Sequence, residues 1–292
     1  MTTGRASDQA DLDGLATLAR EARVREGAVP HTLAGHPVPP GSALLLGGSF
    51  LLRTGTGYAF HYVRGDGVTV ERAVGADPAE QELWLNGSVH AAIAAINGFL
   101  PFHASAVAWD GQVFAVSGPS GAGKSTLAAA LGRHGLPLFC DDTLVLDISD
   151  PARVRCLPGR KRLKLSEEAL VLTGARGREK VSPMVAKRYA EPAGGVVEAV
   201  LPLGQLIFLA DGDSIRLEPI SGARRMVLLD DDHYTAEFVA VARGESRAER
   251  FAWLAGLARR TPMQQLTRPR DVAQFDAVAA RLADWIKKGV RP

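Results

Sequence analysis

The sequence predicts a mixed α/β protein with a small α+β domain at its N-terminus. Two patterns lead to this class. From residue 99 onward, short apolar runs alternate with helical segments, as in α/β folds. Before residue 99, the apolar runs are separated by closely spaced turn residues, which favours an antiparallel β-layer. We therefore expect one domain over residues 1–98 and a second over residues 99–292.

Composition and charge are those of an ordinary globular protein. The chain has 292 residues, of which 46% are hydrophobic and 23% charged, with a net charge of +2. Cys140 and Cys156 form no CxxC pair, which favours a reducing compartment. The N-terminus lacks the apolar core of a signal peptide, and the apolar segment "SALLLGGSFLL" is too short to span a bilayer. We expect a cytoplasmic protein with no membrane partner, and its small excess of basic charge also argues against a nucleic-acid partner.

In the first domain, three segments have recognisable patterns. Apolar residues at helical spacing predict a helix over residues 9–26, and the proline-rich stretch "PHTLAGHPVPPGS" ends it. Residues 43–74 predict the small antiparallel layer. Residues 78–100 predict one or two helices that lead toward the second domain.

In the second domain, the expected elements follow the alternating pattern. Strands are predicted at "SAVAW", "QVFAVS", "PLFC", "RVRCL", "RLKLS", "GQLIFLA" and "SIRLEPI". Helices are predicted at 124–134, where Gly135 ends the helix, and at 246–260 and 271–287. The segment after "RLKLS" is polar and predicts helix or loop. The run "DDDHY" at 230–234 is interpreted as a loop or a helix cap.

The string "GPSGAGKST" at 118–126 matches the phosphate-loop pattern G-x-x-x-x-G-K-[ST], and it stands between a predicted strand and a predicted helix. Glycines allow the backbone amides to turn toward phosphate oxygens, and the helix N-terminus favours the same anion. Lys124 supplies a cation for the β- and γ-phosphates, and the Ser125 hydroxyl can ligate Mg²⁺. The residues expected to contact a nucleotide are Gly118, Ser120, Gly121, Ala122, Gly123, Lys124, Ser125 and Thr126.

A predicted hairpin brings a histidine to this loop. Asp110-Gly111 is a strong two-residue turn signal, and it pairs Trp109 with Gln112. The same register places His103 opposite Gly118, the first residue of the phosphate loop. We therefore expect His103 at the mouth of a nucleotide site.

Two acidic residues, Asp141 and Asp142, end the strand that follows the phosphate-loop helix. A carboxylate delivered beside a phosphate loop commonly holds Mg²⁺ or positions the attacking group. Because neighbouring strand residues point to opposite faces, the two acids can divide these roles. We expect one of them to accept a proton, oriented by His103, and the other to face the metal.

The window 153–188 contains eleven Lys and Arg residues against three Glu. Alternation along a predicted strand places Arg160, Arg162 and Lys164 on one face and Lys161 on the other. Together with Lys187 and Arg188, these cations suit a phosphoryl group or an acidic peptide. The alternative is a solvated basic surface.

These residues together resemble the HPr kinase/phosphorylase family. The resemblance is close over about forty residues and loose over about 99–292. The matching positions are His103, Val107, Gly118, Ser120, Gly121, Gly123, Lys124, Ser125, Asp141 and Asp142. The later segments "LPGRKRLKLSEEAL" and "AKRY" resemble the kinase-like branch that accompanies ribosomally made peptides, including lasso peptides. The family's metal-ligating glutamate in an E-x-R-G context has no match here.

The resemblance implies an ATP- and Mg²⁺-dependent kinase that phosphorylates a serine of a peptide or small protein, in that branch a lasso precursor peptide. It implies that Lys124 and the loop amides hold the phosphates, with Asp141 as base, Asp142 and Ser125 at the metal, and assembly into oligomers. The missing glutamate argues against phosphorylase activity and against HPr itself as the substrate. A small-molecule kinase and an ATP-sensing module without transfer remain as alternatives.

Overall fold

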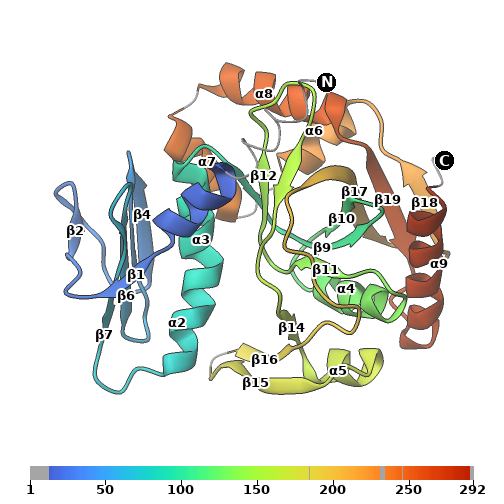
Figure 1. Cartoon of the computed structure of the whole chain (residues 1–292), viewed down its shortest axis with the longest axis horizontal. Helices are drawn as coiled ribbons and strands as arrows, with labels where there is room; N and C mark the ends of the chain where they lie inside the picture. Colours follow the sequence, from blue (N-terminus) through green and yellow to red (C-terminus); the bar gives the residue numbers. More distant parts are fainter. Residues whose placement is uncertain (1–12, 184, 231–233, 245, 290–292) are drawn as a thin grey trace. The chain divides into compact units, whose positions relative to one another are not determined.

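The computed structural model describes residues 13–183, 185–230, 234–244 and 246–289 (Figure 1). They form two compact units. Unit 1 consists of the described residues up to Pro101 together with those from Tyr234 to Arg247, and unit 2 consists of the rest. The domain boundary expected between residues 98 and 99 lies near Pro101, where the chain first passes from unit 1 to unit 2. The return of residues 234–247 to unit 1 had not been anticipated.

Unit 1 contains a five-stranded sheet in the order β1-β7-β6-β5-β4. Its strands are β1 (Val24–Glu26), β4 (Ser42–Leu46), β5 (Ser49–Arg53), β6 (Tyr58–Val63) and β7 (Gly67–Arg72), with a small pair β2 (Thr32–Leu33) and β3 (His36–Pro37). Its helical elements are residues 13–21, α2 (Pro78–Trp84), the π-helical turn η1 (Leu85–Val89), α3 (His90–Ile96) and α7 (Tyr234–Arg243). Strands β4 to β7 pair antiparallel, which confirms the predicted layer.

The helix predicted over residues 9–26 is wrong at its C-terminal end. Residues 9–12 lie outside the described residues, and the helix within them covers 13–21. Residues Val24–Glu26 instead form β1, which pairs parallel with β7 from Val68 to Val70. Pairing with a distant strand therefore overrides the local helical spacing.

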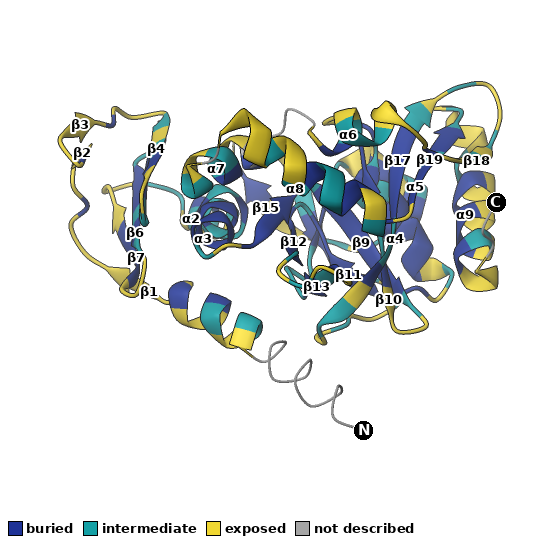
Figure 2. Ribbon diagram, turned by 90° about the horizontal axis from the view of Figure 1, so that it is seen from above, coloured by how far each residue is buried: buried dark blue, intermediate teal, exposed yellow. Residues whose placement is uncertain are grey.

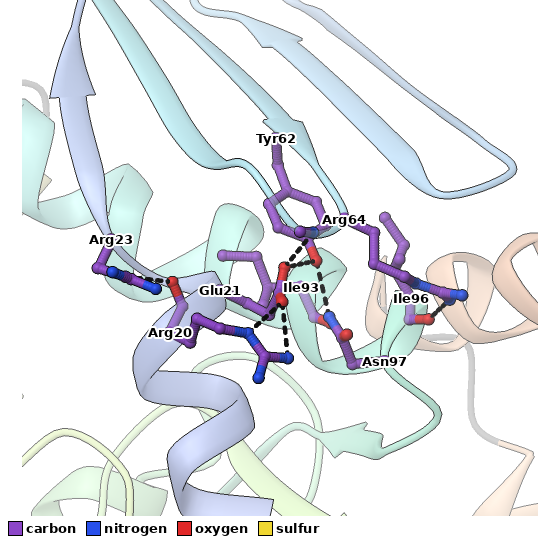
Figure 3. Close-up of polar contacts among 9 residues, drawn as sticks. Arg20, Glu21, Arg23, Tyr62, Arg64, Ile93, Ile96 and Asn97 are labelled. Carbon is purple, nitrogen blue, oxygen red and sulfur yellow. Dashed lines mark hydrogen bonds and ion pairs between the residues drawn. The ribbon is translucent and has the colours of Figure 1, made fainter.

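A buried carboxylate links the first helix of unit 1 to the sheet and to α3. Glu21 is 1% exposed, and it accepts hydrogen bonds from the Tyr62 hydroxyl and the Gly65 amide, each at 2.8 Å (Figure 3). The Tyr62 hydroxyl also accepts a hydrogen bond of 2.8 Å from the Asn97 side chain. Burial by itself raises the pKa of Glu21, but hydrogen bonds from Gly65, Tyr62 and Arg20 outweigh it, so that the pKa is lowered.

Unit 2 is built on a nine-stranded mixed sheet, which confirms the α/β class. Its main path is β11-β9-β10-β17-β13-β12-β8, and β19 and β18 continue from β17. The strands are β8 (Leu100–Phe102), where the chain crosses between units, β9 (Ala104–Trp109), β10 (Gln112–Ser117), β11 (Leu138–Cys140), β12 (Leu144–Asp147), β13 (Arg155–Leu157), β17 (Leu201–Asp211), β18 (Arg216–Pro219) and β19 (Met263–Arg268). Strand β17 runs parallel to both β10 and β19, so the centre of the sheet is parallel and its edges are antiparallel.

A three-stranded sheet and several helices complete unit 2. The sheet contains β14 (Leu163–Leu165), β15 (Gly177–Ser182) and β16 (Val185–Ala190). The helices are α4 (Lys124–Arg133), α5 (Glu167–Thr173), α6 (Ala223–Leu229), α8 (Arg247–Arg260), the 3-10 turn η2 (Val272–Gln274) and α9 (Phe275–Lys288). Apolar residues of α4 and α9 join β9, β10 and β17 in one core, and the central part of the sheet is largely buried (Figure 2).

Three features of unit 2 differ from the predictions. The β15–β16 hairpin occupies a segment predicted as polar helix or loop, and β19 was not predicted. The predicted strand "RLKLS" is regular only over Leu163–Leu165, so that residues 160–162 lie before it. These strands depend on distant partners rather than on a local pattern.

For "DDDHY", Asp230 caps the end of α6, α7 begins at Tyr234, and residues 231–233 lie outside the described residues. None of the helices within the described ranges is long and apolar enough to cross a membrane.

Candidate active site

The β9–β10 hairpin has the predicted register. Gln112 pairs with Trp109, and Ser117 pairs with Ala104 at the other end of the ladder. Asp110 and Gly111 both have positive φ angles, 47° and 68°, as a two-residue hairpin turn requires. The Ser117 hydroxyl donates a hydrogen bond of 3.2 Å to the His103 carbonyl, so His103 lies beside the strand end from which the glycine-rich loop starts.

The loop from Gly118 to Gly123 joins the central strand β10 to α4. Gly121 and Gly123 have φ angles of 78° and 86°, a conformation that favours glycine. At Gly118 an added Cβ would lie 3.3 Å from Cβ of Leu209 on β17, so a larger residue would crowd the neighbouring strand. Among the described residues, no side chain caps the first turn of α4. Its amides are therefore directed toward the space inside the loop.

Lys124 is the first residue of α4 and is 7% exposed. Its ammonium donates hydrogen bonds to the carbonyls of Gly118, at 2.9 Å, and Pro119, at 3.2 Å. These bonds fold the side chain over the loop and hold its charge close to the amides. The arrangement concentrates positive charge at one point on the surface of unit 2.

Asp141 follows β11 and is almost completely buried, with 2% exposure. Its two oxygens accept hydrogen bonds from the Ser105 hydroxyl, at 2.6 Å, and from the Lys164 amide, at 3.0 Å. Ser125 on α4 is a further polar neighbour of this carboxylate. Burial, together with the neighbouring charge of Asp142, raises the pKa of Asp141. Asp141 thus faces the loop serine.

Asp142 has a different environment. Its side chain is 26% exposed, and one oxygen lies 2.7 Å from the Lys164 ammonium. The other oxygen lies 3.7 Å from Nδ1 of His103. Burial raises the pKa of Asp142, but Lys164, and to a smaller extent His103 and Lys187, outweigh it, so that the pKa is lowered. Asp142 therefore stays ionised and faces the histidine rather than the serine.

The backbone at Asp142 is also unusual. Its φ angle is 76°, a left-handed conformation that few non-glycine residues adopt, although Asp and Asn tolerate it best. The turn lets two consecutive acids contact different partners after a strand of only three residues. Strained backbone of this kind is concentrated at functional sites.

The predicted basic residues divide into two groups. Lys164 contacts Asp142 directly, and Lys187 acts on it through its charge. The guanidinium groups of Arg160 and Arg162 stack on the Tyr189 ring at 4.4 and 4.2 Å, and Arg162 also pairs with Glu179. Arg188 pairs with Glu167 at 2.6 Å. The structure thus brings Lys164 to the two acids, whereas Arg160, Arg162 and Arg188 contact other groups.

Sequence reasoning missed Arg268. This residue ends β19, and its guanidinium donates a hydrogen bond to the Ala122 carbonyl in the glycine-rich loop. Because β19 is parallel to β17, its C-terminal end reaches the same edge of the sheet as the loop. Little in the sequence points to this residue, because β19 reads MQQLTR, with only two apolar side chains, and was not recognised as a strand.

No protein-family model matches this chain, and no curated protein is similar to it in sequence. Among solved structures, the chain is similar to the HPr(Ser) kinase/phosphatase from Coxiella burnetii. The alignment covers 64% of this chain and 97% of that chain, with a TM-score of 0.32 and 13% identity.

Proposed function

We propose that the protein is an ATP- and Mg²⁺-dependent kinase that transfers the γ-phosphoryl group of ATP to a serine hydroxyl. One observation carries this proposal: an ionised, partly exposed aspartate lies between His103 and Lys164, next to a buried aspartate that neighbours the serine of a phosphate-loop sequence. A nucleotide-binding module needs the phosphate loop alone. An ionised acid beside it is the group that a phosphoryl transfer requires.

The phosphates of ATP would bind in the loop from Gly118 to Gly123. Inward-facing amides and the N-terminus of α4 supply hydrogen bonds to phosphate oxygens. Lys124 exchanges its bonds to two loop carbonyls for bonds to phosphate, so the cation is already in place when the anion arrives. Phosphoryl transfer depends mainly on positioning and charge neutralisation, and this loop supplies both.

The oxygen donors beside the loop fit Mg²⁺. This ion takes one or two protein oxygens and fills its octahedron with water and substrate phosphates. The Ser125 hydroxyl and the Asp141 carboxylate are such donors, and the two side chains are neighbours. When bound, the ion neutralises charge on the phosphates.

Asp142 is the base in this proposal, which reverses the roles that the sequence suggested for the two acids. A base must reach the acceptor hydroxyl and be ionised at neutral pH. Asp142 is partly exposed and has a lowered pKa, whereas Asp141 is buried and has a raised one. As the serine oxygen bonds to the γ-phosphorus, its proton passes to Asp142, and the bond to the oxygen bridging the β- and γ-phosphorus breaks to release ADP.

The acceptor class follows from the sequence resemblance, which favours a serine in a peptide or small protein such as a lasso precursor peptide. Four further basic side chains suit contact with an acidic segment of such a peptide. They belong to Arg160, Arg162, Lys187 and Arg188. A cytoplasmic location and assembly into oligomers belong to the same proposal.

Transfer can be tested directly with purified protein, Mg-ATP and two acceptor sets: a library of serine-containing peptides, including precursor peptides encoded beside the gene, and a panel of small hydroxyl compounds. We expect phosphate on a peptide serine, detected by mass spectrometry. Chelation of Mg²⁺ by EDTA and the Lys124→Ala variant should each abolish the product. Lys288→Ala, on the exposed end of α9, is the matched control and should retain transfer.

Three outcomes contradict the proposal in distinguishable ways. Phosphate on small hydroxyl compounds alone would replace the peptide acceptor but keep the kinase. ATP binding without transfer to any acceptor would indicate a nucleotide sensor. No ATP binding by the unmodified protein would exclude the phosphate-loop interpretation itself.

A further inference from the structure

A cavity of about 830 Å³ opens beside the glycine-rich loop, entirely within unit 2. Gly121, Ala122 and Thr126 form its loop side. The other walls come from α5 and from the segment that joins β19 to α9. The remaining lining residues are Ser166, Glu168, Ala169, Val171, Leu172, Arg268, Arg270, Val272 and Phe275. Its size falls in the range of small-molecule sites.

The walls away from the loop are apolar and are not fully covered by the protein. Val171 on α5 is 85% exposed, and Val272 in η2 is 69% exposed. Single exposed valines are common on protein surfaces, but these two line one cavity together with Leu172 and Phe275. Apolar side chains from two separate elements therefore face the same space, which suits a flat apolar group.

The loop side of the cavity is cationic. Arg268 donates a hydrogen bond to the Ala122 carbonyl, so its charge lies against the loop. Arg270 adds a second cation and pairs with Asp211 at 2.9 Å. A ligand that matches this cavity has an apolar, ring-like part and an anionic part that extends toward Lys124. A nucleotide has this chemistry.

We propose that this cavity holds the nucleoside of the nucleoside triphosphate, with the base between Val171 of α5 and Val272 of η2, and that it discriminates weakly between purines. The inference rests on nucleotide binding at the loop, as the proposed function does, but not on phosphoryl transfer. Binding is driven by apolar contact, because the valine, leucine and phenylalanine side chains cannot hydrogen-bond a base edge.

Weak discrimination follows from the polar side chains in the lining. The Ser166 hydroxyl already accepts a hydrogen bond from the Ala169 amide at the start of α5. The Glu168 carboxylate accepts hydrogen bonds only, and both adenine and guanine carry an exocyclic amino group that can donate one. We therefore expect ATP and GTP to bind with dissociation constants within about tenfold of each other.

The test compares ATP, GTP and inorganic tripolyphosphate by titration calorimetry with the full chain. The variant Val171→Thr/Val272→Thr keeps the shape of both side chains but replaces a methyl group with a hydroxyl. Both positions are exposed, so the fold should be preserved, which a melting temperature checks. We expect ATP and GTP affinity to fall about tenfold, because apolar contact is lost on two sides of the base. Tripolyphosphate has no base, and its affinity should not change.

Val227→Thr is the matched control, because Val227 is 69% exposed on α6 and does not line the cavity. It should leave all three affinities unchanged. Unchanged ATP affinity in the double variant, or an equal loss for tripolyphosphate, would overturn the nucleoside site. A preference for either nucleotide clearly above about tenfold would overturn the weak discrimination. If nucleotides bind as expected but no acceptor is phosphorylated, the kinase proposal fails and this inference stands.

Discussion

Unit 1 and unit 2 each contain buried acidic groups, but the roles of these groups differ. Glu21 in unit 1 is satisfied by a hydroxyl, a backbone amide and an arginine, and its pKa is lowered. In unit 2, two adjacent aspartates have pKa values shifted in opposite directions by different partners. A single satisfied carboxylate anchors a structure, whereas a pair with separated pKa values is typical of acid–base chemistry. Burial alone does not distinguish the two cases, but the partners do.

The largest effect should come from Asp142→Asn. Asparagine tolerates the left-handed backbone at this position and still accepts a hydrogen bond from Lys164, so the turn should persist. The variant cannot take a proton, and we expect kcat for phosphoryl transfer to fall about 10²- to 10⁴-fold. Steady-state kinetics measure this, with ATP affinity by calorimetry as the check on binding. A variant with near-normal kcat would show that Asp142 is not the base.

Glu21→Gln should affect stability but not transfer. The amide keeps the shape of the side chain but weakens the hydrogen bonds from Tyr62 and Gly65, which costs about 1–3 kcal/mol of unfolding free energy at neutral pH. Denaturant unfolding measures this loss, and kcat should remain unchanged.

The pH dependence of this loss has a definite sign. Because the pKa of Glu21 is lowered in the folded protein, its stabilising contribution is present above the unfolded pKa and is lost as the pH falls through the folded pKa. The difference between Glu21→Gln and the unmodified protein should therefore shrink in acid. A difference that is constant with pH would assign the effect to packing rather than to charge.

The smallest effect is expected from Lys164→Met, as a shift in a pH profile. Lys164 is the main group that lowers the pKa of Asp142, so its removal should raise that pKa. If Asp142 is the base, transfer requires its ionised form, and the rate falls as the pH drops through its pKa. The acid limb of kcat/KM should therefore move to higher pH.

Lys187→Met is the matched control for this profile, because Lys187 is exposed and contributes the smallest of the effects that lower the same pKa. Its acid limb should move much less. A uniform loss of rate in Lys164→Met, with the limb in place, would instead indicate that Lys164 binds the transferring phosphate, as the sequence first suggested.

Local signals predicted much of unit 2. The Asp110-Gly111 turn set the register of the hairpin, because a two-residue turn leaves one pairing for the strands it joins. The glycine-rich loop and α4 were predicted for the same reason, since their pattern lies within a few residues. His103 was placed beside the loop from this register alone.

Features that depend on distant partners were not predicted. The bond between Lys164 and Asp142 joins two segments whose closeness depends on the three-stranded sheet, and the β15–β16 hairpin of that sheet was read as helix or loop. The opposite environments of Asp141 and Asp142 likewise depend on Ser105, Ser125 and Lys164, which come from three different elements. Alternation along a strand could separate the acids but could not say which one is buried.

The path of the chain through α7 has a consequence for synthesis on the ribosome. Helix α7 packs on α3 and β4, and the ring of Phe238 lies 5.2 Å from that of Phe50 inside unit 1. The sheet that holds Phe50 is translated early, but the helix that covers it emerges only after most of unit 2. The apolar surface of the nascent sheet and of α3 that α7 covers therefore stays exposed, and open to aggregation with other chains, until the ribosome has passed residue 247.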